Sequence, residues 1–202
     1  NRNMKKIALL FIVLITMFTA QAQGYKVGDK ATDFSLRNVD GVMVSLADYS
    51  EAKGFIVIFT CNHCPYSIAY EDRIIALDNN FSTLGFPVIA INPNDSTVQP
   101  MDSYSKMVVR AKEKSFPFPY LLDADQSIFM TYGAIRTPHV FILKKENSEL
   151  VVRYIGAIDN NHEDADQVSE KYVYAAVEAL LEGKLPEKNF TKAIGCSIKV
   201  KK

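Results

Sequence analysis

The sequence lacks an excess of charge of either sign, because 23 Lys and Arg residues balance 23 Asp and Glu residues. Without a basic field to attract a polyanion, nucleic acid is not expected as a partner. Cysteine is also scarce, and three residues are too few for a small scaffold held together by many disulfides. Repeats, low-complexity segments and linkers are missing as well. One domain is therefore expected over residues 23–202.

The longest apolar run lies at the N-terminus and is too short for a typical membrane span. Met4-Lys5-Lys6 precedes an almost wholly apolar stretch at 7–20, and Ala20-Gln21-Ala22 offers the small residues that a signal peptidase needs. A spanning helix needs roughly 20 apolar residues. The pattern predicts a cleaved signal peptide over residues 1–22, with residues 1–3 as a leader, in preference to a retained membrane anchor. Export to the bacterial periplasm would place the thiols in an oxidising compartment.

The remaining sequence alternates strand and helix patterns. Asp40-Gly41 separates two short alternating segments, which predicts a β-hairpin near the start of the domain. The alternation of strands and helices favours an α/β fold with a mixed central β-sheet and helices on both faces. Strands are predicted at 33–36, 42–44, 55–59, 88–91, 140–143 and 150–154, and helices at 65–84, 103–114, 126–132 and 167–182.

The segment Cys61-Asn62-His63-Cys64-Pro65 joins the buried strand at 55–59 to the helix that follows. Two cysteines with this spacing can approach closely enough to bond each other, and such a short loop gives a disulfide little value as a structural cross-link. The amino end of a helix stabilises a thiolate, and His63 can add positive charge or a hydrogen bond. The pattern therefore predicts a redox pair that carries a Cys61–Cys64 disulfide when oxidised.

The spacing leaves open which cysteine attacks first. Pro65 suits the first position of the helix, which would make Cys64 the N-cap residue and leave Cys61 in the preceding loop. Cys196 in the short basic tail makes the cysteine count odd. It could resolve a bond to Cys64, pair with another subunit, or stay buried and inert.

Several motifs together resemble one family. They are Ala31-Thr32-Asp33-Phe34, Asp40-Gly41, Phe59-Thr60 before the cysteines, and Thr137-Pro138-His139-Val140. The chain from about residue 25 to residue 181 is similar to the AhpC/TSA (redoxin) branch of the thioredoxin-fold superfamily, and it looks like a peroxiredoxin-like protein that carries a thioredoxin-type cysteine pair.

This resemblance implies a thioredoxin-like fold in which Pro138 is cis and lies against the cysteines. It also implies that the backbone of Thr137 pairs with a substrate peptide and that Pro138 keeps competing groups away from the sulfurs. His139 follows this loop, and a structural role is favoured for it over contact with the site.

The family offers two activities. In thioredoxin-like oxidoreductases the first cysteine attacks a disulfide and the second resolves the mixed disulfide, which would assign Cys61 and Cys64 in that order. Peroxiredoxins carry Thr, a peroxidatic Cys followed by Pro, and a later Arg. Thr60, Cys64-Pro65 and Arg136 are similar to that set, although Thr60 is one residue further from Cys64 than in the family pattern. Disulfide exchange is favoured, and the absence of Trp argues against close kinship to thioredoxin itself.

Two other function classes remain open. A copper-binding thioredoxin-fold protein would use Cys61, Cys64 and a histidine, and the candidates are His63, His139 and His162. The third class is a binding domain that keeps the cysteines without using them. For the favoured class we expect no cofactor, and partners that are protein thiols, protein disulfides or hydroperoxides together with a redox partner protein.

Overall fold

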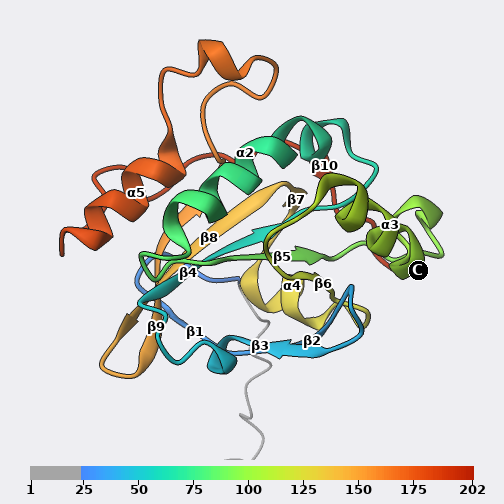
Figure 1. Ribbon diagram of the computed structural model, residues 1–202, viewed down its shortest axis with the longest axis horizontal. Helices are drawn as coiled ribbons and strands as arrows, with labels where there is room; N and C mark the ends of the chain where they lie inside the picture. Colours follow the sequence, from blue (N-terminus) through green and yellow to red (C-terminus); the bar gives the residue numbers. More distant parts are fainter. Residues whose placement is uncertain (1–23) are drawn as a thin grey trace, which may run out of the picture.

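The computed structural model describes residues 24–202, and the predicted signal peptide lies outside them. Among these residues an eight-stranded mixed sheet has the order β1-β9-β8-β4-β5-β6-β2-β3, and a separate two-stranded ribbon pairs β10 with β7 (Figure 1). The strands are β1 (Lys30–Ala31), β2 (Ser35–Asn38), β3 (Met43–Ser45), β4 (Gly54–Phe59), β5 (Val88–Asn92), β6 (Tyr120–Leu122), β7 (Arg136–Thr137), β8 (His139–Glu146), β9 (Glu149–Gly156) and β10 (Cys196–Ser197).

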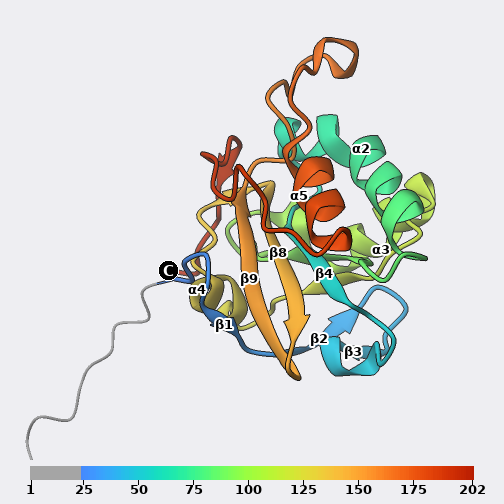
Figure 2. The same ribbon diagram turned by 90° about the vertical axis from the view of Figure 1, so that its left-hand side faces the viewer.

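The α-helices lie on both faces of this sheet, as the sequence predicts. They are α2 (Pro65–Phe81), α3 (Tyr104–Lys114), α4 (Ser127–Tyr132) and α5 (Tyr172–Leu181). Figure 2 shows α2, α3 and α5 on one side of the sheet, and α4 on the other. The 3₁₀ turns within residues 24–202 are η1 (Leu46–Asp48), η2 (Pro100–Asp102) and η3 (Ala165–Gln167).

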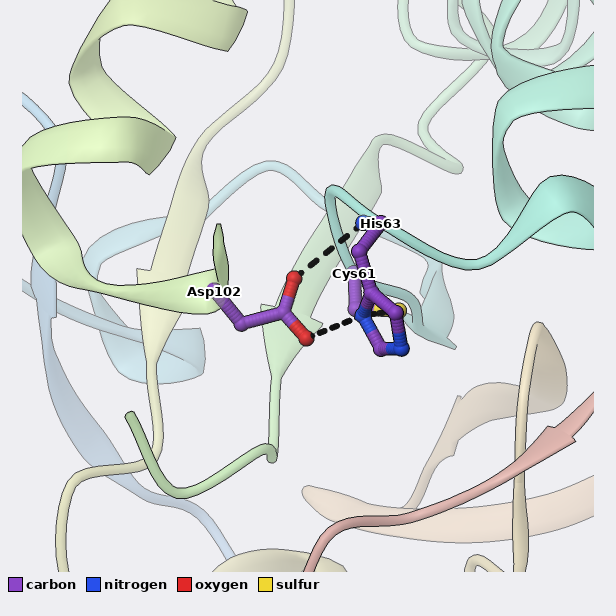
Figure 3. Close-up of side chains that lie close together, drawn as sticks. All are labelled: Cys61, His63 and Asp102. Atoms are coloured by element: carbon purple, nitrogen blue, oxygen red, sulfur yellow. Dashed lines mark hydrogen bonds and ion pairs between the residues drawn. The ribbon is translucent and has the colours of Figure 1, made fainter. Parts of the chain in front are cut away.

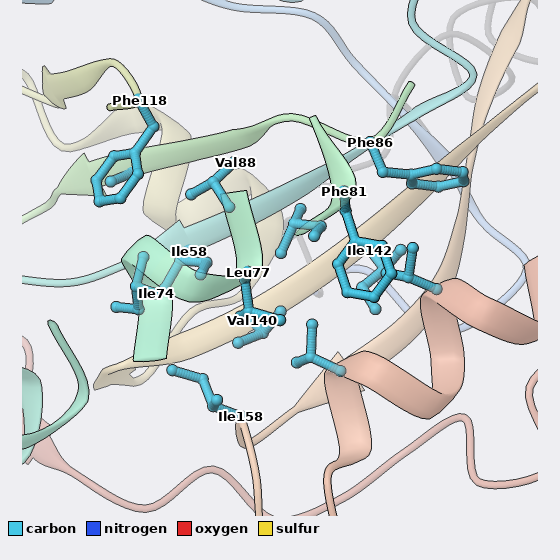
Figure 4. Close-up of a cluster of buried hydrophobic side chains, with 14 of the residues drawn as sticks. Ile58, Ile74, Leu77, Phe81, Phe86, Val88, Phe118, Val140, Ile142 and Ile158 are labelled. Atoms are coloured by element: carbon cyan, nitrogen blue, oxygen red, sulfur yellow. The ribbon is translucent and has the colours of Figure 1, made fainter. Parts of the chain in front are cut away.

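The central strand β4 explains the layered arrangement, because all six of its residues are buried. It pairs in parallel with β5 and antiparallel with β8. Side chains of a strand point alternately to opposite faces, so Ile56 and Ile58 pack under α2 and α5, while Val57 and Phe59 pack toward α4. Figure 4 shows the first of these two cores, where Leu77 and Phe81 of α2 meet the sheet.

The predicted hairpin near the start of the domain is confirmed. β2 and β3 pair antiparallel, with Leu36 opposite Val44. Gly41 in the turn has φ +90°, a backbone conformation that favours glycine, and the Asp40 side chain accepts a hydrogen bond from the backbone N–H of Val42. The second predicted hairpin is formed by β8 and β9.

The structure differs from the sequence analysis at several elements. The helix predicted at 65–84 ends at Phe81. The last helix begins at Tyr172 and not near residue 167, because the N–H groups of Ser169 and Glu170 donate to the Asn160 side chain and hold this segment in a loop. Strand β6 was not predicted. The prolines that exclude a helix just before it still allow an extended segment, and this segment pairs in parallel with β5.

None of the helices in residues 24–202 combines the length and apolar character that crossing a membrane requires.

Candidate functional site

The cysteine segment lies where β4 ends and α2 begins, as the sequence predicts. Cys64 is the N-cap residue of α2, and Pro65 takes the first helical position, where its missing N–H costs no hydrogen bond. The carbonyl of Cys64 accepts the backbone N–H of Ile68, so the helix starts directly after the cysteine. The peptide dipoles of α2 therefore direct their positive end toward the sulfurs.

The disulfide in the structure differs from the predicted one. Cys64 is bonded to Cys196, with 6.1 Å between their Cα atoms, and Cys61 is free. The reason is the tertiary path of the C-terminal tail. β10 pairs with β7 so that Cys196 lies opposite Thr137, and the Thr137 carbonyl oxygen is 3.3 Å from the Cys64 sulfur. A partner 132 residues away in the sequence is thus brought to Cys64 by strand pairing.

The free Cys61 thiol is buried, with 3% of the residue exposed. Its sulfur lies 3.2 Å from the Thr137 hydroxyl, 3.8 Å from the Ser67 hydroxyl and 3.7 Å from Nδ1 of His63. Burial raises the pKa of the Cys61 thiol, and the negative charge of Asp102 raises it further. Hydrogen bonds from Thr137, from the backbone of Cys64 and from Ser67 act against this rise.

This result corrects the expectation that the site favours an ionised thiol, as far as Cys61 is concerned. Burial and the charge of Asp102 together outweigh the hydrogen bonds that lower the pKa of the Cys61 thiol. Cys64 holds the N-cap position and is bonded in this state. Once the disulfide opens, the Cys64 sulfur is therefore the one that the helix dipole stabilises best as a thiolate.

His63 is fixed by Asp102, a residue that the sequence analysis missed. Nδ1 of His63 lies 2.6 Å from one carboxylate oxygen of Asp102, and the other oxygen accepts the backbone N–H of His63 at 3.2 Å (Figure 3). That second oxygen also accepts the backbone N–H of Asn62 at 2.8 Å. Asp102 is fully buried, and a buried carboxylate requires such partners. It holds the turn between the two cysteines in one conformation.

Asp102 is itself held by the turn that follows β5. The Asn94 side chain donates to its carboxylate at 2.7 Å, and the Asn92 side chain donates to its backbone carbonyl at 2.9 Å. The sequence shows only a polar turn over residues 92–95. This turn can hold Asp102 against the cysteine turn because β4 and β5 are neighbours in the sheet.

The Thr137-Pro138 peptide bond is cis, as the family resemblance implies. Thr137 is fully buried and touches both cysteines of the turn, Cys61 through its hydroxyl and Cys64 through its carbonyl. Its backbone is paired with Cys196 of the same chain. Thr60 is also buried, and its backbone N–H donates to the carbonyl of Ile91.

Arg136 and His139 lie on either side of this cis bond. The Arg136 guanidinium donates to the carbonyl oxygen of Gly195 at 2.8 Å, so the structure gives it a contact with the tail. His139 is buried, and burial, followed by the nearby charge of Arg136, lowers its pKa to about 4. Its Nδ1 accepts the backbone N–H of Ile135 at 3.4 Å, which agrees with the structural role favoured from the sequence.

One of the three candidate histidines for a metal site, His63, is grouped with a cysteine in residues 24–202. Ligand atoms of Cys61, His63 and Asp102 all lie within 4.8 Å of one another. The oxygens of Asp102 already accept hydrogen bonds from the cysteine turn and from Asn94, which explains this cluster without an ion. Cys64 is bonded to Cys196, and His162 packs against the Tyr66 ring.

Known proteins resemble the chain in sequence and in fold. A curated relative, the thiol-disulfide oxidoreductase ResA of Bacillus cereus, is 24% identical over 71% of this chain and 86% of its own length. The crystal structure of an uncharacterised conserved protein from Geobacillus kaustophilus is 34% identical, with a TM-score of 0.81 over 89% of this chain and 94% of that one.

A third similar protein identifies the fold. The thioredoxin domain of a thiol-disulfide oxidoreductase from Bacteroides vulgatus is 18% identical, with a TM-score of 0.53 over 66% of this chain and 91% of that one. The predicted thioredoxin-like fold is therefore confirmed. A family model described as Redoxin matches residues 26–170, the part of the chain that contains the sheet, the cysteine turn and the cis proline. The chain therefore belongs to the Redoxin family of oxidoreductases.

Proposed function

We propose that this protein is an exported thiol-disulfide oxidoreductase in which Cys61 and Cys64 carry the chemistry. One observation supports this most strongly: a free thiol, Cys61, lies beside a disulfide that ends on Cys64 at the amino end of a helix. The backbone N–H of Cys64 also donates to the Cys61 sulfur. A thiol held against a disulfide is the arrangement that exchange chemistry uses.

Thiol-disulfide exchange within the protein needs no outside reactant. The Cys61 thiolate attacks the Cys64 sulfur, a Cys61–Cys64 bond forms, the Cys64–Cys196 bond breaks, and Cys196 leaves as a thiolate. When the cysteines are reduced, one thiolate opens a substrate disulfide and a second cysteine resolves the mixed disulfide. The substrate leaves as two thiols, and the protein keeps the disulfide.

His63 acts on this chemistry through its position. A carboxylate can only accept a hydrogen bond, so Nδ1 of His63 carries the hydrogen and donates a hydrogen bond to Asp102. That atom is then unable to take the proton of Cys61, although it lies 3.7 Å from the sulfur. We therefore assign His63 and Asp102 as positioning residues for the turn.

Export is supported by the signal peptide pattern over residues 1–22 and by the disulfide itself. Disulfides persist in oxidising compartments such as the periplasm and are rare in the cytosol. The similarity to the thiol-disulfide oxidoreductase ResA supports thiols and disulfides as substrates. We propose that these belong to proteins and that a separate redox protein is the partner.

Insulin reduction in the presence of dithiothreitol tests this function. Replacing Cys64 with Ser is expected to lower turnover at least a hundredfold, since both proposed bonds end on that sulfur. Cys61→Ser is expected to lower it substantially, and His162→Gln, outside the site, to leave it unchanged. Wild-type activity in both cysteine variants, with folding verified by circular dichroism, would refute the assignment.

A second candidate function, thiol peroxidase, is favoured by the Cys64–Cys196 bond. In that reaction Cys64 would reduce a hydroperoxide to an alcohol and become a sulfenic acid, and Cys196 would then condense with it and release water. The Arg136 guanidinium donates to the carbonyl oxygen of Gly195, so we do not give it the role of activating a sulfur. Hydrogen peroxide consumption faster than insulin reduction, under equal dithiothreitol, would favour the peroxidase.

A further inference from the structure

The C-terminal tail crosses the active site as a strap, defined here as residues 194–197, which is anchored on both sides. Ahead of the strap, the Thr191 hydroxyl lies 2.6 Å from the Tyr154 hydroxyl and accepts the backbone N–H of Ala157 at 2.9 Å. After the strap, the backbone N–H of Lys199 donates to the Asn94 side chain at 2.7 Å. Figure 1 shows the tail running from the α5 side of the molecule to β10, next to β7.

The strap itself fits closely over β7. Cys196 pairs with Thr137, and Arg136 holds the carbonyl of Gly195. A Cβ atom on Gly195 would lie 2.2 Å from the Thr137 carbonyl oxygen, so the backbones approach as closely as glycine allows. These contacts do not depend on the disulfide. They would keep Cys196 next to Cys64 after the bond opens, at a high effective concentration for reclosure.

The three cysteines differ in accessibility. Cys61 and Cys64 are 3% and 0% exposed, whereas Cys196 is half-buried. A thiol from solution therefore reaches Cys196 more readily than either cysteine of the turn. The chemistry favours the same point of entry, because attack on Cys196 expels Cys64 as the leaving thiolate, and that thiolate is stabilised at the amino end of α2.

We propose that Cys196 is a third catalytic cysteine and the point at which an external dithiol delivers electrons. This inference rests on the proposed oxidoreductase function. The first thiolate of the dithiol attacks the Cys196 sulfur, forms a mixed disulfide with it and releases Cys64 as a thiolate. The second thiolate of the dithiol attacks its own mixed disulfide and releases Cys196. The dithiol is oxidised to a disulfide, and the protein gains two electrons.

Glutathione trapping on full-length, oxidised protein tests the point of entry. The Cys61→Ser variant removes internal exchange, and an acid quench followed by peptide mass mapping locates the adduct. At least tenfold more glutathione is expected on Cys196 than on Cys64. A preference for Cys64, or an intact disulfide with no adduct under excess glutathione, would overturn the proposal.

A second measurement separates this proposal from the proposed function. Re-reduction of oxidised protein by dithiothreitol is expected to slow at least tenfold in Cys196→Ser, because the remaining disulfide is buried, and to be unchanged in the neighbouring control Ser197→Ala. If Cys196→Ser and wild type are re-reduced at equal rates, the role of Cys196 is refuted. The proposed function still stands in that case, provided that the protein turns over insulin. If the wild type fails to turn over insulin, the proposed function falls, and glutathione mapping still decides the point of entry.

Discussion

The imidazole of His63 lies 2.6 Å from the buried carboxylate of Asp102, and this contact joins the cysteine turn to the segment that leads into α3. The clamp is supported by a second pair nearby. Arg110 of α3 makes two hydrogen bonds to Glu71 of α2, at 2.7 and 2.6 Å. The helix that follows the cysteine turn and the helix that follows Asp102 are thus fixed to each other.

Asp102→Asn is expected to lower the pKa of the Cys61 thiol, since the carboxylate charge is one of the two causes that raise it. The Asn side-chain oxygen can still accept the backbone N–H groups of the turn. Cys61 is the free thiol of the oxidised protein, so the pH profile of its reaction with iodoacetamide reports this change directly. The profile should move to lower pH.

Asp123→Asn is the matched control, because Asp123 is also buried and also accepts two backbone N–H groups. It should leave the alkylation profile of Cys61 in place. Repeating both measurements in a His63→Gln background removes any change in the charge of the imidazole. A Cys61 profile that stays fixed or moves to higher pH in Asp102→Asn would contradict the electrostatic argument.

Thr137→Val should raise the pKa of Cys61, because it removes the hydroxyl 3.2 Å from the sulfur and keeps the size of the side chain. Loss of a hydrogen bond worth about 1 kcal/mol corresponds to about a fivefold slower alkylation at fixed pH below the pKa of the thiol. Thr131→Val in α4 removes a hydroxyl that bonds only within its own helix. The hydroxyl is not involved if both variants alkylate at the same rate.

Gly195→Ala should lower the fraction of protein that forms the Cys64–Cys196 disulfide. The added Cβ would lie 2.2 Å from the Thr137 carbonyl oxygen and push the strap away from β7. Non-reducing peptide mapping should then show a larger fraction of free Cys196 than in the wild type. Ser197→Ala, at an exposed residue next to Cys196 in β10, serves as the control. Unchanged pairing in Gly195→Ala would mean that close packing is not what holds the strap.

His139 should make the protein less stable in acid. Its pKa is lowered from 6.5 to about 4 in the folded state, so between these values the unfolded chain binds a proton that the folded chain does not. The free energy of unfolding therefore falls as pH decreases from 6.5 toward 4, by on the order of 3 kcal/mol from this group. Urea titrations should show a smaller pH dependence in His139→Gln than in wild type or His162→Gln.

Much of the fold was predictable because its signals are local. The apolar run that becomes β4 is buried on both faces, and the stripe through Tyr70, Ile74 and Leu77 becomes the core face of α2. The start of the last helix was not predictable in the same way. Ser169 and Glu170 are held in a loop by Asn160, a contact made by the tertiary fold and not by local propensity.

The site was predicted in part. The positions of Cys64 and Pro65 at the start of α2 follow from the chemistry of helix caps, and they are confirmed. Asp102 was missed because a single aspartate between a polar turn and a helix carries no local signal. Its role appears only when the sheet brings the loop after β5 beside the cysteine turn.

The α/β order, the junction that presents two cysteines at a helix start, and the family resemblance all follow from the amino-acid sequence alone. These properties depend on residues close together along the chain, where side-chain periodicity and capping act directly. Which sulfurs bond and which thiol is buried depend instead on the three-dimensional fold. The disulfide joins residues 132 apart, and a contact over that distance depends on strand pairing and packing that no local pattern encodes.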